Sequence, residues 1–251
     1  MFWNLVRYEF KNVNKWYLSL YGVILGISVL IGYQSGSLAQ LKNVDDTLIF
    51  FFLALVFGGL MITLFISTLI LIIRRFKGSV YDRQGYLTLT LPVSEHHIIL
   101  SKLFGAFVWT LLSYIVFVAS ISIIIFLSPL EKDYISIYRF FSVHLFENWI
   151  YIPYLVFNAV FGILLIYLSI SIGQLFNEYR TALAVLAYIV INIILSFFGI
   201  FFRIDYSSFG YNLFDHNFDW FLYLQTVKDL ILSIIAYLGT YYILKNKVNL
   251  Q

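Results

Sequence analysis

Residues 48–73 read LIFFFLALVFGGLMITLFISTLILII and contain no charged side chain. A helix needs about 20 residues, at about 1.5 Å each, to cross a hydrocarbon core about 30 Å thick. This stretch is long enough, so it predicts a membrane-spanning helix. Five more uncharged stretches follow the same pattern, although the last is shorter than a span needs: residues 16–36, 103–130, 149–177, 181–202 and 230–244.

The composition of the whole chain agrees with a membrane protein. Apolar residues make up 61% and charged residues 12%, whereas soluble domains carry about 25% charged residues. Lipid cannot hydrogen-bond backbone groups, so spanning segments are helices or a closed barrel. Barrel strands alternate apolar and polar residues, and these unbroken runs do not. The sequence therefore predicts an all-α polytopic membrane protein with six transmembrane helices, at about residues 16–36, 48–73, 103–130, 149–177, 181–202 and 224–244.

The distribution of Lys and Arg residues orients the predicted spans. With the N-terminus in the cytoplasm, six spans return the C-terminus to the same side, and eleven of the 16 Lys and Arg residues then lie there. Basic residues are enriched in cytoplasmic loops, so we expect both termini in the cytoplasm and a multi-pass protein of the cell membrane. Residues 1–15 carry apolar side chains at three- and four-residue spacing beside Arg7, Lys11 and Lys15, which predicts an amphipathic interfacial helix.

The longest predicted cytoplasmic segment, residues 74–102, reads RRFKGSVYDRQGYLTLTLPVSEHHIILSK. Pro92 ends any helix before it, because its ring fixes φ and removes the backbone donor. Ser94 can cap a new helix that has Glu95 in its first turn and continues into the third span. Residues 85–92, GYLTLTLP, form a short apolar stretch at the inner membrane surface. This pattern favours a docking site for a partner over a solvated loop.

The predicted outer segments are rich in aromatic residues. Residues 203–223 form an aromatic element before the sixth span, either an interfacial belt or a re-entrant segment. Lys228 and Asp229 follow it, and two interpretations stay open. They mark the outer end of the sixth helix, with Lys228 reaching the surface, or they line a pathway. In the second case, the candidate pathway or outer-gate residues are Lys228, Asp229, Phe214 and Trp220.

The sequence holds no arrangement of residues that is typical of an enzyme. It has no Cys, no His-Glu-x-x-His motif, no Gly-x-Ser-x-Gly turn and no Gly-x-x-x-x-Gly-Lys-Ser/Thr loop. His96 and His97 are adjacent, so on a helix they point about 100° apart and cannot chelate one metal ion. We expect them at the headgroup level or against a partner. No catalytic, cofactor-binding or metal site is expected on this chain, and its net charge of +3 gives no reason to expect a nucleic-acid partner.

Residues 74–105 resemble the inner segment after the second span in type-two ABC exporter permeases. The similarity lies in a basic stretch, the Gly-Tyr-Leu at residues 85–87, the Leu-Pro-Val-Ser turn at residues 91–94 and a helix that contains Ser-Lys at residues 101–102. Residues 171–176, SIGQLF, are similar to the end of the fourth span in the same family. Six spans, the interfacial helix and the aromatic element complete the resemblance, which covers nearly the whole chain.

The resemblance implies a transmembrane permease subunit whose energy comes from a separate ATPase subunit. ATP and Mg would bind to that partner, and this chain would pair with a second copy or a similar permease to enclose a pathway. In the family, a short helix in the first inner loop docks in a groove of the ATPase subunit. Carried over to this sequence, the coupling residues are Gly85, Tyr86, Leu87, Leu91, Pro92, Val93, Ser94, Glu95 and His96.

The sequence leaves the identity of the cargo open. An aromatic content of 20% suits an amphipathic or hydrophobic compound such as a peptide, a drug or a lipid. One alternative is a membrane subunit that recruits an ABC system or senses with it, and does not itself transport. Another is an ion-coupled carrier, for which Asp229 would be the first residue to neutralise. An intramembrane enzyme is disfavoured because the sequence offers no reactive constellation.

Overall fold

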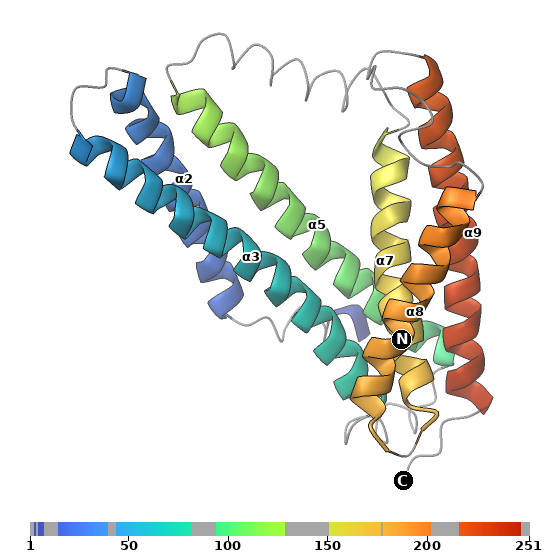
Figure 1. The fold of residues 1–251 in the computed structure, drawn as a ribbon. Helices are drawn as coiled ribbons and strands as arrows, with labels where there is room; N and C mark the ends of the chain where they lie inside the picture. Colours follow the sequence, from blue (N-terminus) through green and yellow to red (C-terminus); the bar gives the residue numbers. More distant parts are fainter. Residues whose placement is uncertain are drawn as a thin grey trace. The chain divides into compact units, whose positions relative to one another are not determined.

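The computed structural model describes residues 3, 5–7, 15–39, 44–81, 94–128, 151–176, 178–201 and 216–246. Regular structure within these ranges is entirely α-helical (Figure 1). The helices are α2 (Lys15–Ala39), α3 (Val44–Val80), α5 (Glu95–Leu127), α7 (Tyr151–Gly173), α8 (Arg180–Phe201) and α9 (His216–Asn246).

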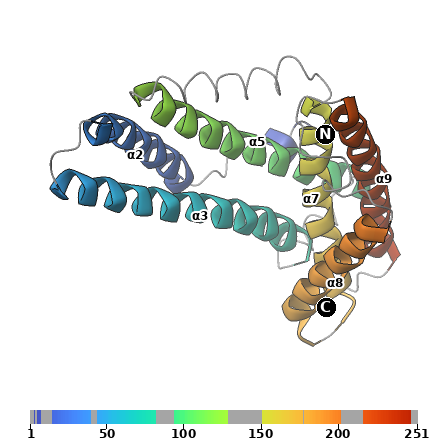
Figure 2. The same ribbon diagram turned by 45° about the horizontal axis from the view of Figure 1, so that its top comes forward.

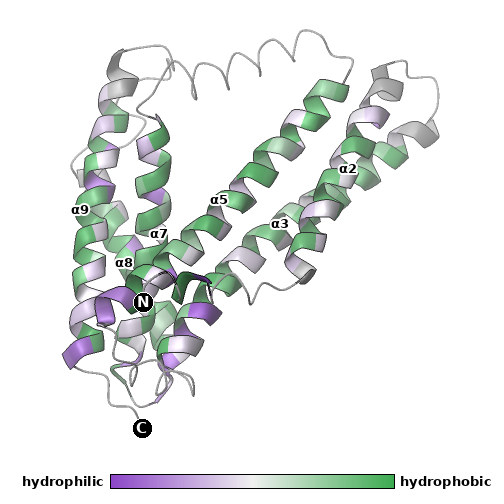
Figure 3. Ribbon diagram, turned by 180° about the vertical axis from the view of Figure 1, so that it is seen from behind, coloured by the Kyte–Doolittle hydropathy of each residue, from purple (hydrophilic) through white to green (hydrophobic). Residues whose placement is uncertain are grey.

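All six helices are long and apolar enough to cross a membrane. Figure 3 shows apolar residues along most of their length, polar residues near the ends of α3 and α9, and further polar residues within α7 and α9. The prediction of an all-α chain with six membrane-spanning helices is confirmed for the length and the apolar composition of the helices. Most of residues 1–15, where the interfacial helix is predicted, lies outside the described residues.

The helix ends differ from the predicted spans, because an uncharged run marks the part suited to lipid and does not mark the helix. α3 continues past residue 73 through Arg74 and Arg75 to Val80. α5 begins at Glu95 and enters the third span without a break, as Ser94 and Glu95 predict. α9 begins at His216, so residues 216–223 of the predicted outer element belong to the sixth helix.

The chain divides into two compact units, and α3 and α5 contribute to both. One unit contains residues 8–71 and 108–143. Its core joins α2, α3 and α5 through hydroxyl groups: Tyr17 lies 2.5 Å from Thr68, Tyr21 lies 2.8 Å from Ser113, and Thr68 lies 3.1 Å from Ser113. These side chains are buried, so each hydroxyl finds in a neighbouring helix the partner that lipid cannot offer. Trp109 packs edge-on against Tyr17.

The other unit contains residues 1–7, 72–107 and 144–251. Within it, α7 and α9 lie side by side, as both views show (Figure 1, Figure 2). A Cβ atom at Gly239 of α9 would come within 2.9 Å of the Leu168 side chain of α7. Small residues allow helices to approach closely in a membrane, and this contact accounts for the close packing of α7 on α9.

A tight turn joins α7 to α8 in the same unit. The Gln174 amide donates to the Ile170 carbonyl at 3.1 Å, and Tyr179 takes a left-handed backbone conformation with φ of 54°. A Cβ atom at Gly173 would lie 2.5 Å from the Arg180 carbonyl oxygen and 2.8 Å from the Ala184 amide nitrogen. Both of these atoms belong to the backbone, so only glycine fits at this position.

Replacing Gly173 with Ala is therefore expected to destabilise the protein by about 1–3 kcal/mol, as overpacking does. Gly162→Ala, in the same helix, is the matched control, because nothing lies within 4 Å of its added Cβ. That control should be neutral or stabilising, since Ala favours a helix over Gly by about 1 kcal/mol. Unfolding by SDS in bicelles measures both variants, and equal stability of the two would contradict the account of the turn.

Candidate functional site

The predicted coupling segment is described only at its two ends. Gly85, Tyr86, Leu87, Leu91, Pro92 and Val93 lie outside the described residues. α3 and its last turn lead into the segment at Tyr81, and α5 continues from it at Ser94. The site is therefore built from these two flanks and from the helices on which they pack.

The α3 flank is attached to α7 by two contacts. The Phe76 ring stacks on Tyr167 with centroids 3.9 Å apart and planes at 8°, and Phe76 is 0% exposed. The Tyr81 hydroxyl donates to Ser171 Oγ at 2.8 Å. Burial raises the pKa of Tyr81 to about 12, although the bond to Ser171 lowers it. The phenol therefore keeps its proton at physiological pH, and the donor of this hydrogen bond is always present.

The α3 flank also reaches α8. Lys77 Nζ donates to Thr181 Oγ1 at 3.0 Å, and Thr181 lies in the first turn of α8. This contact is exposed, so it adds little stability by itself. Through this contact, Lys77, the last basic residue of α3, lies beside the turn between α7 and α8.

The α5 flank begins as the sequence predicts. The Ser94 carbonyl accepts from the His97 amide at 3.0 Å, which starts the helix. The Ser94 hydroxyl lies 2.5 Å from His97 Nδ1. Glu95 follows in the first turn, where its negative charge favours the helix N-terminus.

His96 packs on α9, which sequence reasoning did not foresee. Its Nδ1 and the Tyr237 hydroxyl share a hydrogen bond of 2.6 Å, and its ring stacks on Tyr241 with centroids 4.0 Å apart and planes at 17°. Lys245 Nζ lies 5.6 Å from the centroid of the same Tyr241 ring. The expected place for His96 was the headgroup region or a partner; in the structure, it contacts this chain's own sixth helix.

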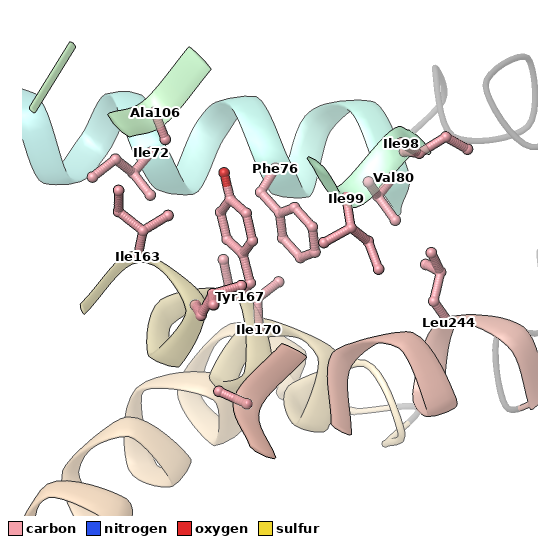
Figure 4. Packing of buried hydrophobic residues seen from close by; sticks show 12 residues of the cluster. Ile72, Phe76, Val80, Ile98, Ile99, Ala106, Ile163, Tyr167, Ile170 and Leu244 are labelled. Carbon is pink, nitrogen blue, oxygen red and sulfur yellow. The ribbon is translucent and has the colours of Figure 1, made fainter. Parts of the chain in front are cut away.

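Both flanks meet in one buried cluster, which we call the flank core. Figure 4 shows side chains from α3, α5, α7 and α9 directed toward one another in it. Phe76, Val80 and Ile99 are 0% exposed, and Tyr167 is too. The full cluster is Ile72, Phe76, Val80, Ile98, Ile99, Ala106, Ile163, Leu164, Tyr167, Ile170, Ala236 and Leu244. Residues on both sides of segment 82–93 are thus built into a packed interior.

A second candidate site lies at Asp229, in the interface of α7 and α9. Asp229 is 1% exposed, and its Oδ2 accepts from Asn158 Nδ2 at 3.1 Å. Lys228 Nζ lies 3.5 Å from Asp229 Oδ1 and also bonds to Gln225 Oε1. Because the apolar helix runs from Trp220 to Asn246, the carboxylate lies inside the candidate span.

The pair of Lys228 and Asp229 lies inside the sixth helix and not at its first turn, since α9 begins at His216. The Lys228 side chain is 41% exposed, in keeping with an outward direction, whereas the Asp229 side chain is 2% exposed and faces α7. Asn158 was not recognised from the sequence, although it is a polar amide in an otherwise apolar run.

The other two candidate gate residues are Phe214 and Trp220. Phe214 lies outside the described residues. Trp220 is 60% exposed, while the next two residues, Phe221 and Leu222, turn inward and pack with Tyr151 and Tyr154 of α7. Among the described residues, no group of three or more His, Asp and Glu side chains is placed to hold a metal ion.

Comparison of the chain with protein-family models, with curated proteins and with solved structures finds no match.

Proposed function

We propose that this chain is the transmembrane permease subunit of an ATP-driven ABC exporter. A separate ATPase subunit, which binds ATP and Mg, would dock on residues 85–96 from the cytoplasm. Two such permeases, identical or similar, would enclose the pathway in the cell membrane. The cargo would be an amphipathic or hydrophobic compound such as a peptide, a drug or a lipid. The resemblance of residues 74–105 to such permeases supports the proposal, as do the six long apolar helices.

The observation that carries the proposal is the flank core on both sides of segment 82–93. A docking segment can move the membrane-spanning helices only if the residues on either side of it are held firmly against those helices. Phe76 and Val80 on one flank and Ile98 and Ile99 on the other are at most 2% exposed. Interiors packed to this degree transmit displacement because they deform little. A partner that pushes on the segment would therefore push on α7 and α9 as well.

The orientation supports the same function. Eleven basic residues on the side of segment 82–93 favour the cytoplasm, where ATP is found. The chain itself has no phosphate-binding loop, which agrees with an ATPase site on another subunit.

A direct test is the replacement of Leu91 with Asp, which puts a charge into the apolar docking stretch. The variant is expected to lose co-purification of the ATPase subunit or, if the subunit stays bound, to lose transport driven by ATP. Burial of one unpaired carboxylate costs several kcal/mol, enough to reduce binding at least tenfold. Pull-down with a tagged permease measures the effect.

Tyr179→Asp provides the control for added charge, because Tyr179 is 79% exposed in the turn between α7 and α8. This second variant should bind the ATPase subunit like the wild type. If Leu91→Asp also binds the ATPase subunit and transports like the wild type, residues 85–96 are not the docking site.

Asp229 favours a second candidate function, an ion-coupled carrier. A carboxylate inside a span is costly and usually marks an ion or proton path. Asp229 is buried in the α7–α9 interface with an amide donor from another helix. Transport that follows an ion or proton gradient without ATP would establish this function in place of the first.

A further inference from the structure

The start of α5 is fastened to α9 through the side chain of His96. The imidazole bonds to Tyr237 at 2.6 Å and stacks on Tyr241 at 4.0 Å. We infer that His96 is a positioning residue, which makes α9 move with segment 82–93 when a partner acts on that segment. This inference rests on the proposed function and deepens it by naming the route from the docking segment to the sixth span.

His96 is held on α9 by two different kinds of contact. The hydrogen bond between its Nδ1 and the Tyr237 hydroxyl is directional and weakens when either group shifts. The stack on Tyr241, with planes at 17°, holds the face of the imidazole against α9. His96 stands in the first turn of α5, directly after the segment. A displacement of the segment therefore reaches this ring before it reaches the rest of α5.

The next step of the route is α9 itself. Tyr237 and Tyr241 are one helical turn apart and share a face of α9, while Ala236 and Gly239 lie against α7. α9 is one continuous helix from His216 to Asn246. Movement imposed at Tyr237 would thus reach Asp229, eight residues or about 12 Å away along the axis. The Asn158–Asp229 bond lies where α9 would shift against α7.

The α3 flank takes a different route. Tyr81 bonds to Ser171 of α7, and Lys77 bonds to Thr181 of α8. Ala236 and Leu244 of α9 also belong to the flank core. Loss of the His96 contacts should therefore weaken the link between α9 and the segment, while α7 and α8 stay attached through Tyr81 and Lys77. A measurement of the distance between α8 and α9 therefore distinguishes protein in which α9 follows the segment from protein in which it does not.

The test uses the complete complex of the permease with its ATPase subunit in lipid. The chain has no Cys, so a permease labelled before the ATPase subunit is added carries nitroxides only at the two sites introduced, Leu186→Cys on α8 and Ile235→Cys on α9. Both positions are 57% exposed. Labelled chains are diluted with unlabelled ones, and the distance between the labels is measured by pulsed electron resonance without nucleotide and after trapping with ADP and vanadate.

The expected result is a change in this distance in the otherwise wild-type chain, and a smaller change in His96→Ala and in Tyr241→Ala. Tyr237→Phe removes only the hydrogen bond and should reduce the change without unfolding the protein. His96→Asn, which keeps a polar atom near the place of Nδ1, should restore part of it. Tyr242→Ala is the matched control, because Tyr242 is 58% exposed beside Tyr241, and it should leave the change intact.

Three results would overturn the inference. The first is a full distance change in His96→Ala while the ATPase subunit is bound, and the second is no distance change in the wild-type background under the same condition. The third is loss of ATPase binding in His96→Ala but not in Tyr237→Phe and Tyr241→Ala, because His96 would then contact the partner directly. Failure of the proposed function looks different, since the wild-type chain would then bind no ATPase subunit at all.

Discussion

Replacing Phe76 with Ala is expected to lower the free energy of unfolding by about 3–5 kcal/mol. The side chain is 0% exposed and stacks on Tyr167 at 3.9 Å in the middle of the flank core. Its removal leaves a cavity where α3 and α7 meet and ends the aromatic contact between them. Unfolding by SDS in bicelles, followed by tryptophan fluorescence, measures the loss.

Phe65→Ala is the matched control for this prediction. Phe65 lies on the same helix but is 68% exposed, so its removal should change stability by about 0.5 kcal/mol or less. If Phe76→Ala and Phe65→Ala cost the same, the flank core does not hold α3 on α7. The residues that flank segment 82–93 would then not be firmly anchored.

Replacing Asn158 with Leu is expected to cost about 1.5–3 kcal/mol, the usual range for a hydrogen bond to a charged group. Asp229 stays buried in this variant, and its carboxylate loses the amide donor from α7. Lys228, at 3.5 Å and 41% exposed, is a weak substitute. The same unfolding experiment measures the change.

A double-mutant cycle with Asp229→Leu supplies the control. Removing both partners leaves no unpaired carboxylate, so the double variant should be more stable than the sum of the two single losses implies. Strict additivity would mean that the bond does not stabilise the α7–α9 interface. Asp229→Asn separates the two candidate functions: an ion-coupled carrier would lose transport, whereas an ATP-driven exporter would keep it.

The helices could be predicted from the sequence because lipid imposes a simple length requirement on apolar runs. The start of α5 could be predicted too, since Pro92 and Ser94 act on the residues next to them. The ends of α3 and α9 could not be predicted in this way. Arg74, Arg75 and Lys77 are unsuited to lipid but suited to a helix, so α3 leaves the apolar run and continues.

The partners of the candidate site residues could not be read from the sequence, because they come from distant parts of the chain. His96 and Tyr237 are 141 residues apart, and Asn158 and Asp229 are 71 apart. A sequence shows that Asp229 is charged and lies near an apolar run, but its direction depends on α7. The same holds for His96. The sequence does not show that α9 lies beside this residue, so its ring could equally face the headgroups or a partner.

The most direct test of the proposed function is purification of the tagged wild-type chain from the membrane of its own host. The account predicts that an ABC ATPase subunit co-purifies in stoichiometric amount and that the complex, reconstituted in liposomes, hydrolyses ATP in the presence of Mg. Absence of any ATP-hydrolysing partner, together with transport that follows an ion gradient, would contradict it.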